Sequence, residues 1–261
     1  MSNFPPDSPL VNRVAPSPNH GPRAGGVRPD ILLLHYTGMA STDAALKQLC
    51  DPKSKVSSHY LICEDGRIVQ LVPEARRAWH AGVSSWEGKT DINSRSIGIE
   101  IANPGHDFGY PDFPEVQIKA VIALCQDIVL RHPIRADRVL GHSDVAPARK
   151  QDPGEKFPWR RLADEGVGLA PKVFTLNPED GRLTFGDGAH GKRVSDLQGQ
   201  LAKYGYGVGQ SGNYDGETHA VVTAFQRHFR PERVDGRADP STIKTLRALL
   251  KAQADLKRQV R

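Results

Sequence analysis

Two histidines and one aspartate stand where this chain could hold a metal ion. His35 follows directly on the apolar run 31–34, and His142 follows the short apolar segment 139–140 in the same way. Asp152 comes ten residues after His142, in a loop that contains proline and glycine. Two histidines and a carboxylate form a known catalytic zinc set, which leaves a fourth position open for water. The alternative is that these are structural residues, because the spacing matches no short zinc motif.

A carboxylate and a lysine could act beside such a metal. Glu100 lies in an alternating pattern that puts it on one strand face with Ser96 and Gly98, small residues that leave space above the sheet. A carboxylate over open space beside a metal can take a proton from water. Lys150, two residues before Asp152, could reach the same site and neutralise an oxyanion. The alternatives are a solvent-exposed strand face for Glu100 and a solvated loop lysine.

The elements that must position these residues alternate between strand and helix patterns. Strand patterns occupy residues 31–34, 59–63, 68–71, 96–101 and 139–140. Apolar residues at helical spacing occupy 42–49 and 116–130. Interleaved strands and helices predict an α/β domain whose mixed sheet is flanked by helices.

The composition changes at both ends of this predicted domain. Residues 1–28 are rich in proline and lack periodicity, which predicts an irregular N-terminal arm. Residues 171–190 are rich in Pro and Gly and predict a linker, after which 191–261 contains three segments with an apolar face at helical spacing. We therefore expect a catalytic domain over 29–170 and a small domain of three helices. A domain joined in this way usually folds alone and meets its neighbour through a modest interface.

The overall composition is that of a globular protein. Hydrophobic residues make up 38% and charged residues 25% of the chain. No run approaches the roughly 20 apolar residues that span a bilayer. The formal net charge is +5, but the basic residues are spread along the chain and no nucleic-acid motif accompanies them. We expect no nucleic-acid partner, and an anionic polymer or fragment suits the basic excess as well.

The three cysteines, Cys50, Cys63 and Cys125, include no C-x-x-C pair, which argues against a thiolate zinc site. Their odd number favours free, reduced thiols, and the N-terminus does not have the pattern of a secretory signal. Both observations favour a cytoplasmic location. The alternative is the periplasm.

Several sequence blocks, in order, resemble one enzyme family. They read LLLHYTG, VSSHYLI, RIVQLVPE, AWHAG, SIGIEIANPG, QIKAVIAL and VLGHSDVAPARKQDPGEKFPW. The segment from about residue 29 to 168 resembles the zinc N-acetylmuramoyl-L-alanine amidases of the AmpD/AmiD type, which have the amidase/peptidoglycan-recognition fold. Residues 195–246, with L-Q-x-x-L, Y-G-Y, G-x-Y-D-G-x-T and V-x-x-F-Q, resemble the small peptidoglycan-binding domain often attached to such enzymes.

The resemblance implies a role for five residues. His35, His142 and Asp152 match the zinc ligands of the family, Glu100 its general base, and Lys150 the residue that stabilises the tetrahedral intermediate. It also implies one zinc ion per chain and peptidoglycan or muropeptide fragments as partners. The reaction would be hydrolysis of the amide between the lactyl group of N-acetylmuramic or 1,6-anhydro-N-acetylmuramic acid and L-alanine. We expect the enzyme to be a monomer. Enzymes of the AmiD type are exported lipoproteins, and the appended domain also favours an exported enzyme.

Other residues have two interpretations each. His80 in AWHAG and His59 in SSHYLI could line the substrate groove, or they could bind backbone groups and hold loops; we favour the groove for His80. Asn93 could contact the stem peptide or cap a turn. Three tyrosines of the C-terminal segment could stack on sugars or pack in a core: Tyr204, Tyr206 and Tyr214.

Two rival functions belong to other classes. The first is a wall-binding recognition protein without catalysis, and the complete set of five matching residues argues against it. The second is a zinc hydrolase for another amide, such as a peptide bond. The matching blocks outside the metal site argue against that function.

Overall fold

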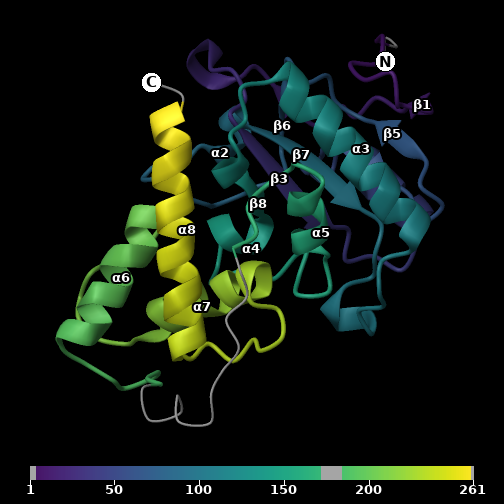
Figure 1. Cartoon of the computed structure of the whole chain (residues 1–261). Helices are drawn as coiled ribbons and strands as arrows, with labels where there is room; N and C mark the ends of the chain where they lie inside the picture. Colours follow the sequence, from purple (N-terminus) through teal and green to yellow (C-terminus); the bar gives the residue numbers. More distant parts are fainter. Residues whose placement is uncertain (1–3, 172–183, 260–261) are drawn as a thin grey trace.

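A computed structural model describes residues 4–171 and 184–259, and its centre is a six-stranded mixed sheet (Figure 1). The strands are β1 (Arg13–Val14), β3 (Ile31–Tyr36), β4 (Tyr60–Ile62), β5 (Ile68–Gln70), β7 (Ser96–Ile101) and β8 (Val139–Gly141). Their order is β1-β5-β4-β7-β3-β8; only β4 and β5 pair antiparallel. A second, two-stranded sheet joins β2 (His20–Gly21) to β6 (Arg77–Ala78). The predicted mixed α/β architecture is confirmed.

Helices lie on both faces of the sheet and in a C-terminal bundle. The sheet domain contains α1 (Thr42–Cys50), α2 (Ile92–Arg95), α3 (Glu115–Arg131), α4 (His142–Val145) and α5 (Trp159–Asp164). The bundle consists of α6 (Lys192–Tyr204), α7 (Gly216–Phe229) and α8 (Pro240–Gln259). Three short 3-10 turns cover Ala24–Gly26, His106–Phe108 and Ala136–Arg138. Within the described ranges, no helix has both the length and the apolarity to cross a bilayer.

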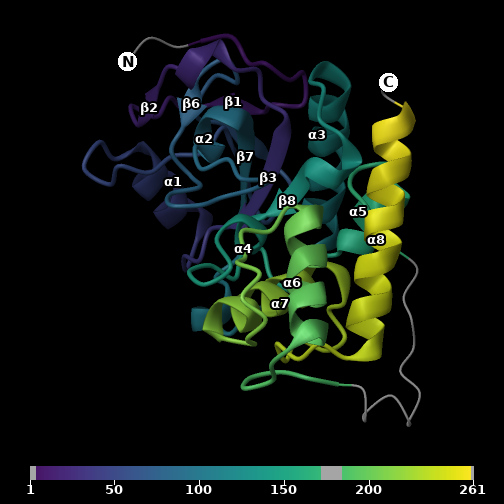
Figure 2. The ribbon, with the colours of Figure 1, turned by 90° about the vertical axis from the view of Figure 1, so that its left-hand side faces the viewer.

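The alternation of side chains along β3 and β7 separates two apolar layers. Leu32 and Leu34 pack with the isoleucines of β7 and with α3 on one face. Ile31 and Leu33 point to the other face, in a different cluster. Figure 2 shows α3 and α1 on opposite sides of the strands. The second face therefore remains available to the bundle and to polar groups at the strand ends.

The N-terminal arm lies on this domain and is not wholly irregular. β1 extends the main sheet beside β5, and β2 pairs with β6. The prediction of an arm without secondary structure is wrong in this respect. Each strand has only two residues, which is too short to give a detectable alternation.

The bundle and the sheet domain share one apolar core. The core contains Ile31, Leu33 and Trp86 from the sheet domain together with the buried faces of α6, α7 and α8. The Trp86 ring meets the rings of Tyr204 and Tyr206 edge-on, at centroid distances of 5.9 and 5.0 Å. The prediction of a modest interface is therefore wrong, because helical periodicity reveals an apolar face but not its partner.

The three tyrosines of the bundle are core residues. Tyr204, Tyr206 and Tyr214 are each at most 3% exposed, so none of them offers a ring to a sugar at the surface. Their periodicity and burial agree with the packing interpretation.

Replacing Trp86 by alanine should destabilise the whole chain. The substitution removes a fully buried ring that joins the two parts, so we expect the free energy of unfolding to fall by about 3–5 kcal/mol. Urea unfolding of the full chain, followed by both fluorescence and circular dichroism, measures this. Val83→Ala is the matched control, because Val83 lies in the same segment and is 88% exposed. An equally small effect for both variants would contradict a shared core.

Candidate metal centre and catalytic site

Strand register brings the candidate residues together. β3 and β7 pair in parallel with His35 opposite Glu100, about 4.8 Å apart as neighbouring strands are. On its other edge β3 pairs with β8 so that Leu34 lies opposite Gly141, and His142 is the next residue. The loop that contains Asp152 is held against the same turn, because the Ser143 N–H donates to the Asp152 carbonyl oxygen at 3.0 Å.

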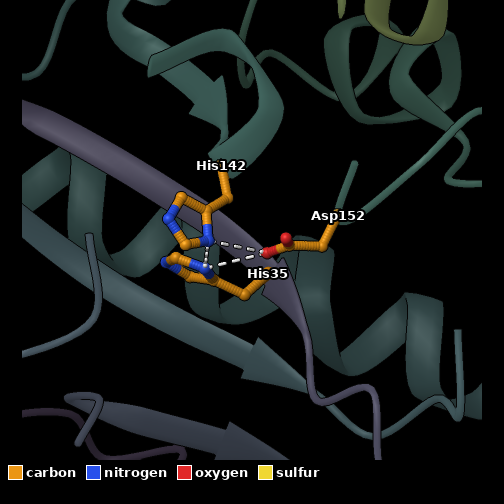
Figure 3. A group of neighbouring side chains, drawn as sticks. All are labelled: His35, His142 and Asp152. Carbon is orange, nitrogen blue, oxygen red and sulfur yellow. Dashed lines mark hydrogen bonds and ion pairs between the residues drawn. The ribbon is translucent and has the colours of Figure 1, made fainter. Parts of the chain in front are cut away.

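Three buried side chains converge on one point (Figure 3). The Nδ1 atoms of His35 and His142 lie 3.0 Å apart, and each lies 3.0 Å from Oδ2 of Asp152. All three side chains are buried. These atoms are one imidazole nitrogen from each histidine and one carboxylate oxygen, which is the donor set of a catalytic zinc site. Among the described residues, this is the group of His, Cys, Asp and Glu side chains that could hold a metal.

The hydrogen bonds made by the Nε2 atoms of His35 and His142 determine the protonation of their Nδ1 atoms, which face each other at the centre of this group. His142 Nε2 lies 3.0 Å from the carbonyl oxygen of Ala81, so that nitrogen carries the proton and donates. His35 Nε2 lies 3.0 Å from Nδ1 of His80. His80 Nε2 in turn faces Oγ of Ser96 at 3.3 Å, and that hydroxyl donates to a backbone carbonyl. His35 Nε2–H then donates to Nδ1 of His80, and His80 Nε2–H donates to Ser96. Nδ1 of His35 and Nδ1 of His142 are therefore both unprotonated, and each faces a carboxylate oxygen of Asp152. Three acceptors at this separation repel one another unless a cation lies between them, so the site fits a metal.

One short loop supplies both outer contacts. Residues 80 and 81 are fixed by Asn93, whose Oδ1 accepts the N–H groups of His80 and Ala81 at 3.0 and 2.9 Å. The His80 ring lies over Gly98, where a Cβ would come within 2.6 Å of the ring. The space that Ser96 and Gly98 leave above the sheet is therefore filled by His80.

Burial and mutual electrostatic interaction set the charge states of the three converging side chains, His35, His142 and Asp152, which we call the triad. Burial, and next the nearby His142, lower the pKa of His35 to about 4. Burial opposes ionisation of Asp152, but the adjacent imidazole rings of His142 and then His35 outweigh it and hold the pKa of this carboxyl well below its usual range. A neutral His35 and an ionised Asp152 are the forms that bind a metal.

Glu100 and Lys150 line the same cleft as the triad. The cleft has a volume of about 380 Å³. Oε2 of Glu100 is buried without a hydrogen-bond partner in the described structure, and it belongs to a carboxylate that borders open space. Burial, reinforced by the negative charge of Asp152, raises the pKa of Glu100 well above its usual value, while Lys150 opposes the shift. Such a carboxyl is suited to accept a proton near neutral pH.

His59 lies behind the cleft wall. It is fully buried; its Nδ1 accepts the Gly98 N–H at 2.9 Å, and its Nε2 lies 3.0 Å from the carbonyl oxygen of Arg76. Both ring nitrogens are engaged within the protein, which is the loop-holding alternative. Burial, and then the nearby Arg23, lower the pKa of His59 to about 3.

His80 borders the cleft and also contacts His35, whereas the side chain of Asn93 holds the His80 loop. Three further cleft residues were not singled out from the sequence. Tyr36 follows His35, Trp79 precedes His80, and Arg149 donates to the carbonyl oxygens of Ala81 and Val83. Their adjacency to residues already singled out was the available signal.

The chain matches two family models. The model described as "N-acetylmuramoyl-L-alanine amidase" matches residues 25–155, and the one described as "Putative peptidoglycan binding domain" matches residues 190–246. The N-acetylmuramoyl-L-alanine amidase AmiD of Escherichia coli is 40% identical over 233 residues, which cover 84% of this chain and 82% of that protein. The 1,6-anhydro-N-acetylmuramyl-L-alanine amidase AmpD of Enterobacter cloacae is 36% identical over 167 residues, 58% of this chain and 87% of that protein.

A solved structure has the same fold. AmiD from E. coli, in complex with the substrate anhydro-N-acetylmuramic acid-L-Ala-D-gamma-Glu-L-Lys, superposes with a TM-score of 0.72 at 37% identity. The match covers 88% of this chain and 91% of that one. The similarity therefore extends over both the sheet domain and the bundle.

The full chain should bind one zinc ion, and His35→Ala should lose it. The substitution removes one of three converging donors, and the two that remain make an incomplete site. Metal analysis after dialysis against trace zinc measures the stoichiometry. His190→Ala, at an exposed position, is the control and should keep the metal. Full occupancy in His35→Ala would remove His35 from the site.

His59 should make the protein sensitive to acid. The unfolded chain protonates this side chain near pH 6.5 and the folded chain only near pH 3, so the unfolded state binds the extra proton between these values. The resulting loss of stability is about 1.4 kcal/mol per pH unit as the pH falls through this window. His59→Gln keeps an acceptor for Gly98 and a donor for Arg76, and should show a shallower decline in urea unfolding from pH 6.5 to 4. Parallel pH profiles for the two proteins would contradict a buried, neutral His59.

Proposed function

This chain belongs to the family of N-acetylmuramoyl-L-alanine amidases, and we propose that it hydrolyses the amide between the lactyl group of N-acetylmuramic or 1,6-anhydro-N-acetylmuramic acid and L-alanine. Such a reaction belongs to peptidoglycan turnover and recycling. The observation that carries the proposal is the convergence of His35, His142 and Asp152 in an open cleft, beside a carboxylate whose buried Oε2 has no hydrogen-bond partner among the described residues.

His35, His142 and Asp152 would hold a single zinc ion through Nδ1, Nδ1 and Oδ2. When bound, zinc supplies a Lewis acid that makes water acidic enough to be deprotonated near pH 7 and that polarises a carbonyl group. The fit rests on the unprotonated donor atoms described above. A structural thiolate site has no support in the spacing of the cysteines.

Glu100 is the proposed general base. Its position opposite His35 in the register supports this role, because it would lie beside a metal held by His35, and the carboxylate borders the cleft that a substrate would enter. As the water attacks the lactyl carbonyl carbon, Glu100 takes its proton. The same carboxyl group can then pass the proton to the nitrogen of L-alanine, which leaves as an amine.

Lys150 is the proposed partner of the developing oxyanion. It lines the cleft, and its positive charge acts on Glu100 from across the same site. A fixed charge or donor of this kind contributes about 3 kcal/mol to stabilisation of the transition state.

His80 and Asn93 are proposed as positioning residues. His80 accepts the outer proton of His35, and Asn93 fixes the loop whose carbonyl group accepts the outer proton of His142. Such contacts select the tautomer of a ligating histidine and hold its ring in place. The substrate-binding role suggested by the sequence for His80, Asn93 and His59 stays a prediction, and of these His80 borders the cleft that contains the proposed zinc ligands.

We further propose a catalytic unit over 29–170 and a wall-binding unit over 191–261, joined by 171–190, most of which lies outside the described residues. The peptidoglycan-binding family match supports the second unit. All the proposed reacting groups come from one chain, which supports a monomer. Three free cysteines, two of them buried, support a reducing compartment such as the cytoplasm, and cell fractionation tests this.

Glu100→Gln should keep zinc yet lower kcat on a soluble muropeptide by at least about a hundredfold, because it preserves shape and removes only the proton acceptor. Release of the stem peptide, followed by chromatography, measures kcat, with zinc content determined on the same sample. Glu165→Gln, at an exposed position after α5, is the matched control. A variant with nearly normal kcat would place the base elsewhere. A parent chain that binds zinc and muropeptide without cleaving it would favour a recognition protein.

A further inference from the structure

The turn that presents His142 is held by a buried carboxylate. α4 begins at His142, and its third residue, Asp144, is completely buried. Oδ2 of Asp144 accepts the N–H of Gly141 at 2.7 Å, which fixes the junction between β8 and α4. Two residues further along, the N–H of Ser143 donates to the backbone carbonyl oxygen of Asp152. This one turn therefore orients a metal ligand and anchors the loop of another.

The other donors to this carboxylate come from the C-terminal bundle. The hydroxyl group of Tyr206 donates to Oδ1 of Asp144 at 2.6 Å, and Nδ1 of His228 lies 2.7 Å from Oδ2. Tyr206 and His228 are themselves buried. A buried carboxylate requires such donors, because burying it without hydrogen-bond partners strongly destabilises the folded chain. Of its three hydrogen-bond partners among the described residues, two thus belong to a part of the chain that lies more than sixty residues away.

The ring of His228 is held in place by stacking. Its ring stacks on that of Trp159 with centroids 3.7 Å apart and planes 24° apart. The preceding residue on α7, Arg227, donates from Nη2 to Oε1 of Gln151 at 3.2 Å and lies 3.6 Å from Glu155. Helix α7 therefore contacts both the His142 turn and the loop on either side of Asp152. Figure 1 shows α4 lying between β8 and α7.

We propose that the C-terminal bundle is part of the active-site scaffold, with Tyr206 and His228 as positioning residues that hold His142 in its ligating orientation through Asp144. The inference rests on the proposed zinc site. A domain that only tethers the enzyme to a wall polymer would need contact with neither the His142 turn nor the Asp152 loop. Loss of these donors should loosen the turn and weaken metal binding, which outer-shell substitutions typically do by 10–100-fold.

The full chain allows a matched test. Tyr206→Phe removes one hydroxyl group, and Tyr214→Phe is the control, because Tyr214 is equally buried in the bundle and donates at 2.6 Å to the carbonyl oxygen of Gly236, within the bundle. His228→Gln serves as a second variant should Tyr206→Phe fold poorly. We would measure the zinc dissociation constant by chelator competition, the visible spectrum of the Co²⁺-substituted protein, and kcat and KM on a soluble muropeptide.

Tyr206→Phe and His228→Gln should bind zinc about tenfold more weakly, alter the cobalt spectrum and lower kcat, with KM little changed. Tyr214→Phe should match the parent in all of these even if its melting temperature falls as far. Variants at 206 and 228 that also match the parent would overturn this proposal alone. A parent chain that binds no zinc would overturn the proposed function and this inference together.

Discussion

Parallel pairing of β3 with β7 on one edge and with β8 on the other decides where His35, Glu100 and His142 lie. In this register His35 is the neighbour of Glu100, and Gly141 delivers His142 to the same end of the sheet. A shift of one residue would turn His35 and Glu100 to the face covered by α3. The apolar side chains of Leu32 and Leu34 prevent that shift, since their burial on the α3 side fixes the register. Packing on one face thus specifies chemistry on the other.

The site depends equally on buried polar groups that must be held in place by hydrogen bonds from their neighbours. Three acceptor atoms lie 3.0 Å apart at its centre, and a further buried carboxylate oxygen nearby has no hydrogen-bond partner in the described structure. A cation between the three atoms would relieve their mutual repulsion, and the surroundings must resist displacement of the donor side chains. The loop at residues 80–81, the Asn93 amide and the Asp144 carboxylate provide that resistance through directed hydrogen bonds.

Much of this arrangement can be predicted from the sequence, for identifiable reasons. Continuous apolar runs reveal the buried strands, and a strand end reveals where His35 must project. The alternation along β7 correctly places Glu100 on the same strand face as Ser96 and Gly98, opposite the three isoleucines. The contacts of His80 could not be predicted, because a side chain that fills space above Gly98 leaves no periodic trace. Helical spacing likewise showed the apolar stripes of α6, α7 and α8, but not that Trp86 lies among them.

The shared core has a consequence for how such modules can be exchanged. In an architecture joined only by a flexible connector, a binding cassette can be transplanted between enzymes without regard to its neighbour. Here a chimera would have to carry Trp86 and Asp144 along with the helices that cover them, or replace both with residues suited to water. Substitutions on the two sides of this contact should therefore be inherited in matched sets, so the sheet domain and the bundle evolve as one unit.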